Sequence, residues 1–132
     1  MTEADLIQRY FAAFNAGDAD GMAALVADDV QHYPNQGELR TGKDAFRAFL
    51  AEMDRAYREE ARDLAIFTGP TGRVAAEFVI HGTYLEAQSG LPEANGQVYV
   101  LPVGSFFEVA GDRITRVTTY YNLDDWLRQV GG

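Results

Sequence analysis

Cysteine is absent from this chain of 132 residues. Its absence excludes disulfides, thiolate metal sites, iron–sulfur clusters and cysteine nucleophiles together, and it fits a reducing compartment. Long apolar runs are missing too, since nothing near the roughly 18 consecutive apolar residues of a membrane span occurs. The N-terminal residues 1–5 are acidic, whereas a signal peptide begins with basic residues. We therefore expect neither a membrane span nor a signal peptide, and a cytoplasmic location.

Positive charge and metal-ligating groups are scarce. The 11 Lys and Arg residues stand against 20 Asp and Glu residues, so the net charge is −9 and the pI is near 4.5. Such a chain repels phosphate backbones and anionic lipid headgroups, so we expect no nucleic acid and no membrane as a partner. The two histidines, His32 and His81, form no metal motif, and Ser89 and Ser105 lie in no nucleophile elbow. With no phosphate-binding glycine loop either, we predict no metal and no cofactor.

The apolar content is ample for one folded domain over residues 1–132, because 47% of the residues are hydrophobic and 12% are aromatic. Three helices are predicted in the first part of the chain. Thr2 caps the first, with Asp5 in capping-box position, and Gly17 ends it. Asp18 caps a short second helix that carries Met22, Leu25 and Val26, and an extended segment follows over residues 30–33 until residues 34–37 break it. Thr41 caps the third helix, whose charged end at residues 59–60 is interpreted as a solvated face.

From residue 61 the apolar period changes to two, which predicts strands over residues 61–68, 74–84, 97–109 and 113–121. A closing helix containing Trp126 follows, capped by Asn122 or Asp124. Helices followed by an antiparallel meander are typical of an α+β fold. A curled sheet with its helices on one face encloses a cone-shaped hollow. The other sheet face, with Val79 and Thr83 among Glu77 and His81, is apolar enough to predict a homodimer.

Several segments resemble a known superfamily. Residues 9–18 (RYFAAFNAGD) and 25–30 (LVADDV) are similar to the N-terminal part of nuclear transport factor 2-like (NTF2-like) proteins, which include ketosteroid isomerases, SnoaL-type polyketide cyclases and limonene epoxide hydrolases. Residues 79–84 (VIHGTY), 96–102 (GQVYVLP) and 116–123 (RVTTYYNL) resemble the group called ketosteroid isomerase-related proteins. The resemblance spans nearly the whole chain. It implies a cone-shaped, cystatin-like fold with three N-terminal helices packed on a strongly curved antiparallel sheet.

The resemblance also implies site residues. The tyrosine that donates a hydrogen bond to the steroid oxyanion matches Tyr10, and the second oxyanion donor, an aspartate, falls on Ser105. The catalytic aspartate falls on Tyr33 or, with a different gap, on His32. Alternation along a strand turns at most one of these two side chains inward. Tyrosine, with a reference pKa near 10, is a better proton donor than acceptor, so the general base is not identified.

We therefore hypothesise a cofactor-free enzyme that transfers protons on an apolar, ring-containing molecule in the cone. The alternative is a non-catalytic dimer that binds a small molecule, and a protein–protein adaptor is a third class. The residues predicted to line the hollow are Phe14, Phe78, Tyr84, Tyr99, Leu101, Val103, Val117 and Tyr121. The loop over residues 88–96 is expected to form the rim of its mouth.

Overall fold

The computed structural model describes residues 1–35 and 37–131, so Gln36 of the predicted chain break and Gly132 of the predicted domain lie outside it. The described part confirms the α+β class. Its elements, in chain order, are α1 (Glu3–Asn15), α2 (Ala19–Ala23), β1 (Val26–Tyr33), β2 (Arg40–Thr41), α3 (Lys43–Ala56), β3 (Tyr57–Thr68), β4 (Arg73–Tyr84), β5 (Val98–Ala110), β6 (Arg113–Tyr121) and α4 (Leu123–Gly131).

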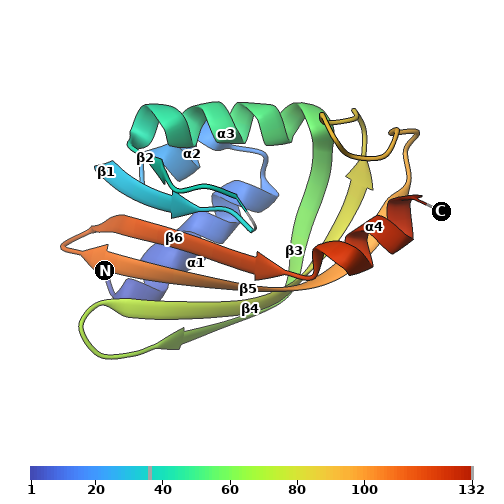
Figure 1. Ribbon diagram of the computed structural model, residues 1–132. Coiled ribbons are helices and arrows are strands. Elements are labelled where there is room, and N and C mark those ends of the chain that lie inside the picture. The colour runs from blue at the N-terminus through green and yellow to red at the C-terminus, as the bar shows by residue number, and fades with distance from the viewer. Residues whose placement is uncertain (36, 132) are drawn as a thin grey trace.

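One sheet contains all six strands, in the order β2-β1-β6-β5-β4-β3. Strands β3 to β6 form the predicted antiparallel meander. The sheet is not wholly antiparallel, because β1 pairs with β6 in the parallel direction. Figure 1 shows the long strands bending, with α1 behind them and α3 across their upper end. The apolar core therefore lies between the concave sheet face and the helices.

Local sequence explains where the first helices begin. The Thr2 hydroxyl accepts a hydrogen bond from the Asp5 amide at 3.1 Å, and the Asp5 carboxylate accepts one from the Thr2 amide, which completes the predicted capping box. Asp18 caps α2 as predicted. This helix is shorter than expected, because Val26 already belongs to β1. The Thr41 cap was also wrong: Thr41 ends β2, and Gly42, whose φ of 99° suits glycine, precedes α3.

The largest departure from the predicted elements is the end of α3. The helix ends at Ala56 and runs without a loop into β3, where Tyr57 is already extended. The carbonyl oxygen of Ala56 accepts hydrogen bonds from the amides of Leu85 and Glu86, which follow β4. Because β3 pairs with β4 from its first residue, tertiary pairing ends the helix where neither glycine nor proline does. Glu59 therefore lies on a strand and not on a solvated helix end.

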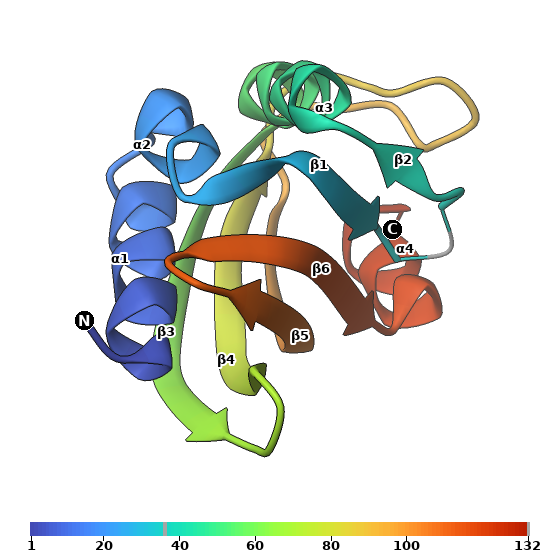
Figure 2. The same ribbon diagram turned by 90° about the vertical axis from the view of Figure 1, so that its left-hand side faces the viewer.

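Curvature of the sheet depends on β3, the edge strand beside α1. The register of β3 shifts between Arg62 and Ala65, and Asp63 at φ 55° bends the strand. The Asn15 side chain accepts a hydrogen bond from the Ala61 amide at 2.8 Å and donates one to the Ala61 carbonyl oxygen at 3.0 Å. It therefore satisfies two backbone groups of this edge strand that have no partner strand on that side. Figure 2 shows the bent strands, with α1 on one side and α4 on the other. No helix of the described residues is both long and apolar enough to cross a membrane.

Candidate active site

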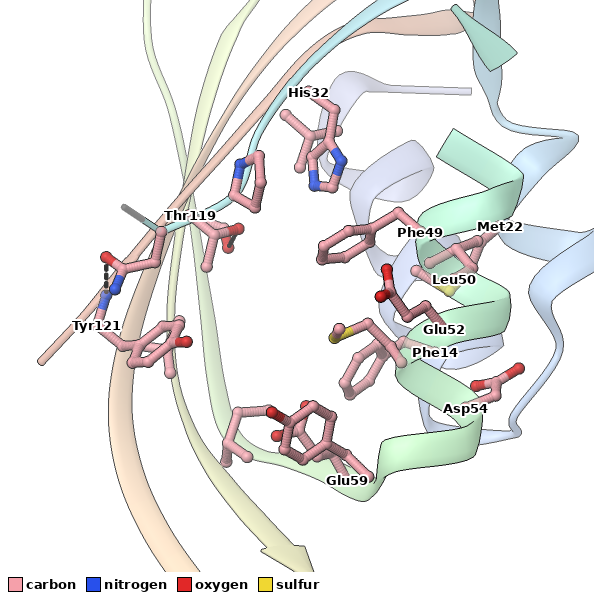
Figure 3. Close-up of a pocket in the computed structure, with 18 of the residues that line it drawn as sticks. Phe14, Met22, His32, Phe49, Leu50, Glu52, Asp54, Glu59, Thr119 and Tyr121 are labelled. Carbon is pink, nitrogen blue, oxygen red and sulfur yellow. Dashed lines mark hydrogen bonds between the residues drawn. The ribbon is translucent and has the colours of Figure 1, made fainter. Parts of the chain in front are cut away.

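The concave side of the sheet encloses a cavity of about 750 Å³. Residues from all four helices and all six strands of the described part contribute to its wall. Figure 3 shows His32 and Glu59 at opposite ends of the hollow, with Phe49 and Glu52 of α3 on one side and Tyr121 of β6 on the other. The volume suits a ligand of a few fused rings, since small-molecule sites measure about 300–1,000 Å³.

At one end of the cavity, two residues behind the wall fix the position of the wall residue Glu59, and the three lie in a row across neighbouring strands. Glu59 of β3 pairs with Gly82 of β4, and Gly82 pairs with Tyr99 of β5. The Tyr99 hydroxyl donates a hydrogen bond to Oε2 of Glu59 at 2.5 Å. The Tyr99 ring reaches across because Gly82 has no side chain: a Cβ there would lie 2.3 Å from Cζ of Tyr99. The backbone register thus brings the carboxylate and its donor together.

Glu59 is a carboxylate whose surroundings favour its protonated form. Burial raises the pKa of its carboxyl, and the hydrogen bond from Tyr99 partly opposes this rise. Burial and the neighbouring Glu59 charge raise the pKa of Tyr99, so its hydroxyl stays a donor. Tyr99 is the one hydrogen-bond partner of the Glu59 carboxylate among the described residues, which leaves carboxylate surface facing the cavity. A half-buried carboxylate of this kind can accept a proton from a bound molecule.

Aromatic side chains surround this end. Trp126 of α4 lies with its ring centroid 5.0 Å from that of Tyr84 and 6.0 Å from that of Tyr99, in edge-to-face geometry. Tyr57 stacks on Tyr84 and donates a hydrogen bond to Gln88 of the rim loop at 2.6 Å. Gln88 and Leu91 line the cavity, so the loop over residues 88–96 lies at its edge. The cluster keeps the surroundings of the carboxylate largely apolar.

His32 lies at the other end. Its ring packs edge-on against Phe46 and Phe49, with centroids 5.3 and 4.6 Å apart, and the side chain is 5% exposed. Burial, together with the positive charge of Arg40, lowers the pKa of His32 to about 4. The imidazole is therefore neutral at pH 7. Tyr33 is absent from the cavity wall, because it follows His32 on β1 and alternation turns it to the other face.

Neutral donors occupy the wall between the two ends. Tyr10 of α1 packs edge-on against Phe11 and Phe107, and burial raises the pKa of its hydroxyl, so it remains protonated. Ser105 of β5 faces Thr119 of β6 across the ladder, with the two hydroxyl oxygens 3.0 Å apart. All three hydroxyl side chains line the cavity. They can donate hydrogen bonds to an oxygen that gains charge.

The structure brings most of the predicted residues together. The cavity wall contains Tyr10, Phe14, His32, Phe78, Leu101, Val103, Ser105, Val117 and Tyr121. Tyr84 and Tyr99 are buried but lie behind the wall, because their rings pack among the other aromatic side chains. Among the described residues, no three His, Asp or Glu side chains are grouped so as to hold a metal ion. The roles of these residues stay predictions.

Sequence reasoning missed Glu59. Its signal was present, because Tyr57, Glu59 and Ala61 alternate with the exposed Arg58 and Glu60. Five charged residues within residues 54–60 (DRAYREE) instead favoured a helix face in water. The sequence of a short strand with one inward carboxylate looks the same as that of a solvated helix face, and only the partner strand distinguishes the two. Glu59 was therefore overlooked because the end of the helix was misplaced.

Comparison with known proteins agrees with this architecture. Residues 7–117 match the SnoaL-like domain family. A protein of Pseudomonas putida KT2440, provisionally described as a polyketide cyclase, is 50% identical, with 98% of each chain covered and a TM-score of 0.96. One of Silicibacter sp. TM1040 with the same provisional description is 53% identical, covers 98% of this chain and 96% of its own, and also has a TM-score of 0.96.

A more distant structure supports the fold alone. It is a protein from Catenulispora acidiphila DSM 44928 with a ketosteroid isomerase-like fold, solved with trimethylamine, and it is 20% identical to this chain. The alignment covers 96% of this chain and 92% of that one, with a TM-score of 0.72. The family match over most of its length and the two structures at 50% identity or more identify the chain as a member of the SnoaL-like domain family, and its fold is ketosteroid isomerase-like.

Proposed function

We propose that this protein is a cofactor-independent enzyme that moves a proton on an apolar, ring-containing carbonyl compound held in the cavity. The observation that carries the proposal is the Glu59 carboxylate, which faces the cavity from an aromatic surround and whose pKa burial raises. A carboxylate with a raised pKa is a stronger base than an exposed one, and positioned general bases contribute about 10²–10⁴-fold to a rate. This residue takes the place of the base that the family resemblance left unassigned.

The proton transfer follows from the cavity chemistry. Glu59 takes a proton from the carbon next to the ligand carbonyl, and the electron pair of that C–H bond moves into the carbonyl to give an enolate. Tyr10, held protonated by burial, donates a hydrogen bond to the enolate oxygen, with the Ser105 and Thr119 hydroxyls as further donors. Glu59 then returns the proton to the same carbon or to a conjugated one. Isomerisation and ring-closing reactions both begin with this step.

Solvent deuterium exchange tests the proposal without knowledge of the natural substrate. Ring ketones such as 1-tetralone and a steroid β,γ-enone are incubated with the protein in D₂O, and mass spectrometry follows deuterium incorporation. We expect the protein to exchange deuterium faster than buffer alone does. Glu59→Gln should reduce this protein-catalysed rate by at least about 100-fold. Tyr10→Phe should reduce exchange by a smaller factor, because other hydroxyl donors remain.

Matched variants separate the role of Glu59 from a general loss of charge. Glu60→Gln removes the neighbouring exposed carboxylate, and Glu52→Gln removes one of the two carboxylates, Glu52 and Asp54, that α3 supplies to the cavity wall. Both should exchange deuterium at rates near that of the unmodified protein. If only Glu52→Gln lost exchange, the general base would be Glu52 of α3 and not Glu59. Tight binding of ring ketones with no exchange would favour the alternative, a non-catalytic binding protein.

We further propose that two copies associate through the outer sheet face. Apolar side chains are exposed there: Val98 is 73% exposed, and Val100, Phe106 and Tyr120 of β5 and β6 are exposed with it. Phe106 and Tyr120 pack edge-on at 5.8 Å, and Val100 pairs with His81 of β4, so the patch is continuous across strands. A second copy of this face would cover it, as isologous dimers do.

Sedimentation velocity tests the dimer. We expect a species of twice the 14.6 kDa chain mass at micromolar concentration, and Val100→Asp should shift it to the monomer. Glu38→Lys, at an exposed position between β1 and β2 and off the proposed interface, is the control for a charge change and should remain a dimer. A monomer at every concentration would rule out this interface.

A further inference from the structure

His32 is a polar side chain that the protein itself leaves unsatisfied. It is 5% exposed on the cavity wall between Phe46 and Phe49, and its Nδ1 atom is buried without a hydrogen-bond partner among the described residues. Native proteins rarely bury a polar group unpaired, because its lost hydration is not replaced. No ligand reaches the enclosed Nδ1, but Nε2 of the same ring is not enclosed and also has no hydrogen-bond partner among the described residues, so Nε2 is the atom that a group from outside the chain can bind.

The two ring nitrogens of His32 differ in their surroundings. Burial and the charge of Arg40 keep the imidazole neutral, so it carries one N–H and one lone pair. Nδ1 is the enclosed nitrogen, which leaves Nε2 as the one on the cavity side. An unpaired buried donor is rarer than an unpaired acceptor. The proton therefore belongs on Nε2, where a ligand can reach it.

Two further side chains of the same cavity wall, Asn35 and Arg40, also carry hydrogen-bond donors. Asn35 lines the cavity, and its Oδ1 atom already accepts a hydrogen bond from the Tyr121 amide, whereas its Nδ2 atom is buried without a partner among the described residues. Arg40 lines the same cavity and lies over the Phe49 ring at 5.1 Å. An end with an imidazole N–H, an amide N–H and a guanidinium suits a ligand oxygen that only accepts, such as a carbonyl oxygen. It repels a cation.

We infer that His32 donates a hydrogen bond from Nε2 to a carbonyl oxygen of the ligand and thereby selects substrates with a second oxygen function remote from the reacting carbon. His32 and Glu59 lie at opposite ends of the hollow, so this oxygen is not the one that becomes an enolate (Figure 3). Binding energy from a remote group positions the reacting carbon at the base. The inference rests on the proposed function for the identity of the base, and it adds the chemistry of the substrate's far end.

Imidazole nitrogen NMR tests the tautomer. The chain has two histidines, so a protein labelled with ¹⁵N-histidine gives two ring spectra, and His81→Gln assigns them. At pH 7 we expect a pyrrole-type shift for His32 Nε2 and a pyridine-type shift for its Nδ1. A proton found on Nδ1, or an imidazolium, would overturn the inference.

A matched ligand pair tests the recognition. 2-Acetylnaphthalene carries a carbonyl oxygen, and in 2-isopropenylnaphthalene a CH₂ group replaces that oxygen with nearly the same shape. We expect the ketone to bind about five- to tenfold more tightly and to move the His32 Nε2 signal, which the hydrocarbon does not. In His32→Phe the preference should disappear while the affinity for the hydrocarbon stays within twofold. His32→Gln, which keeps an N–H donor, should retain part of the preference and serves if His32→Phe does not fold.

Binding and exchange can fail separately. Equal affinity of the unmodified protein for the two ligands would overturn the role of His32 whether or not deuterium exchange occurs. Glu59→Gln should lose exchange and keep the ketone preference. If exchange persists in Glu59→Gln while the ketone preference depends on His32, the proposed base is wrong and the recognition by His32 stands.

Discussion

Replacement of Gly82 by alanine should separate Tyr99 from Glu59 without touching either side chain. The new Cβ would lie 2.3 Å from Cζ of Tyr99 and 2.6 Å from its hydroxyl oxygen, whereas carbon atoms in contact lie about 3.5–4.0 Å apart. The ring has little room to move, because it packs edge-on against Tyr57 and Trp126 at 6.4 and 6.0 Å. The substitution therefore forces the phenol away from the carboxylate.

The magnitude follows from what is lost. A hydrogen bond to a charged group contributes about 1.5–3 kcal/mol. Overpacking by one methyl group costs about 1–3 kcal/mol. Because breaking the bond relieves part of the overpacking, the two effects do not add fully, and we expect Gly82→Ala to lower the free energy of unfolding by about 2–4 kcal/mol. The pKa of Glu59 should rise further, since the bond from Tyr99 lowers it.

Urea unfolding followed by the fluorescence of the single tryptophan, Trp126, measures the stability, and carboxyl ¹³C NMR measures the pKa of Glu59. Gly104→Ala on β5 is the matched control, because its Cβ would meet its nearest neighbour, Phe106, at an ordinary 3.6 Å. It should change the stability by no more than about 1 kcal/mol. Equal stabilities of the two variants, with an unchanged Glu59 pKa, would refute the claim that Gly82 makes space for the Tyr99 ring.

Two pH-dependent effects follow from the buried titratable groups. The pKa of Glu59 is raised on folding, so the folded protein binds the proton more tightly and stability falls as pH rises from about 4.5 through the folded pKa. Glu59→Gln should lack this fall. Between pH 4 and pH 8, the free energy of unfolding of Glu59→Gln should therefore rise relative to that of the unmodified protein, by about 1.4 kcal/mol for each pH unit by which folding raises the pKa of Glu59. Urea unfolding at the two pH values measures this difference. The pKa of His32 is lowered from 6.5 to about 4, so its contribution is complete above pH 6.5 and is lost as pH falls toward 4. Between pH 7.5 and 3.5, the unmodified protein should lose about 3 kcal/mol more than His32→Phe, and parallel pH profiles of the two proteins would contradict the lowered pKa.

Much of the fold was predictable because its signals are local. Thr2 and Asp5 define the start of α1 within one turn, and the apolar alternation over residues 74–84 places the inward side chains of β4 without reference to any other strand. The positions of Tyr10 and Ser105 on the cavity wall follow from the same two periodicities. Capping and periodicity need only neighbouring residues, so they are legible in the chain itself.

The positions of Glu59 and His32 on the cavity wall could not be predicted, because they depend on contacts between residues that are distant in sequence. The sequence around Ala56 favours a continuing helix, and only the pairing of β3 with β4 makes Tyr57 extended and turns Glu59 inward. Whether His32 or Tyr33 faces the cavity likewise depends on the register of β1 against β6. Strand pairing joins residues that are far apart in sequence, and a shift of one residue exchanges the two faces of a strand. The tertiary structure therefore decided which carboxylate and which imidazole face the cavity, whereas the sequence by itself determined the family and the helix and strand patterns that form the hollow.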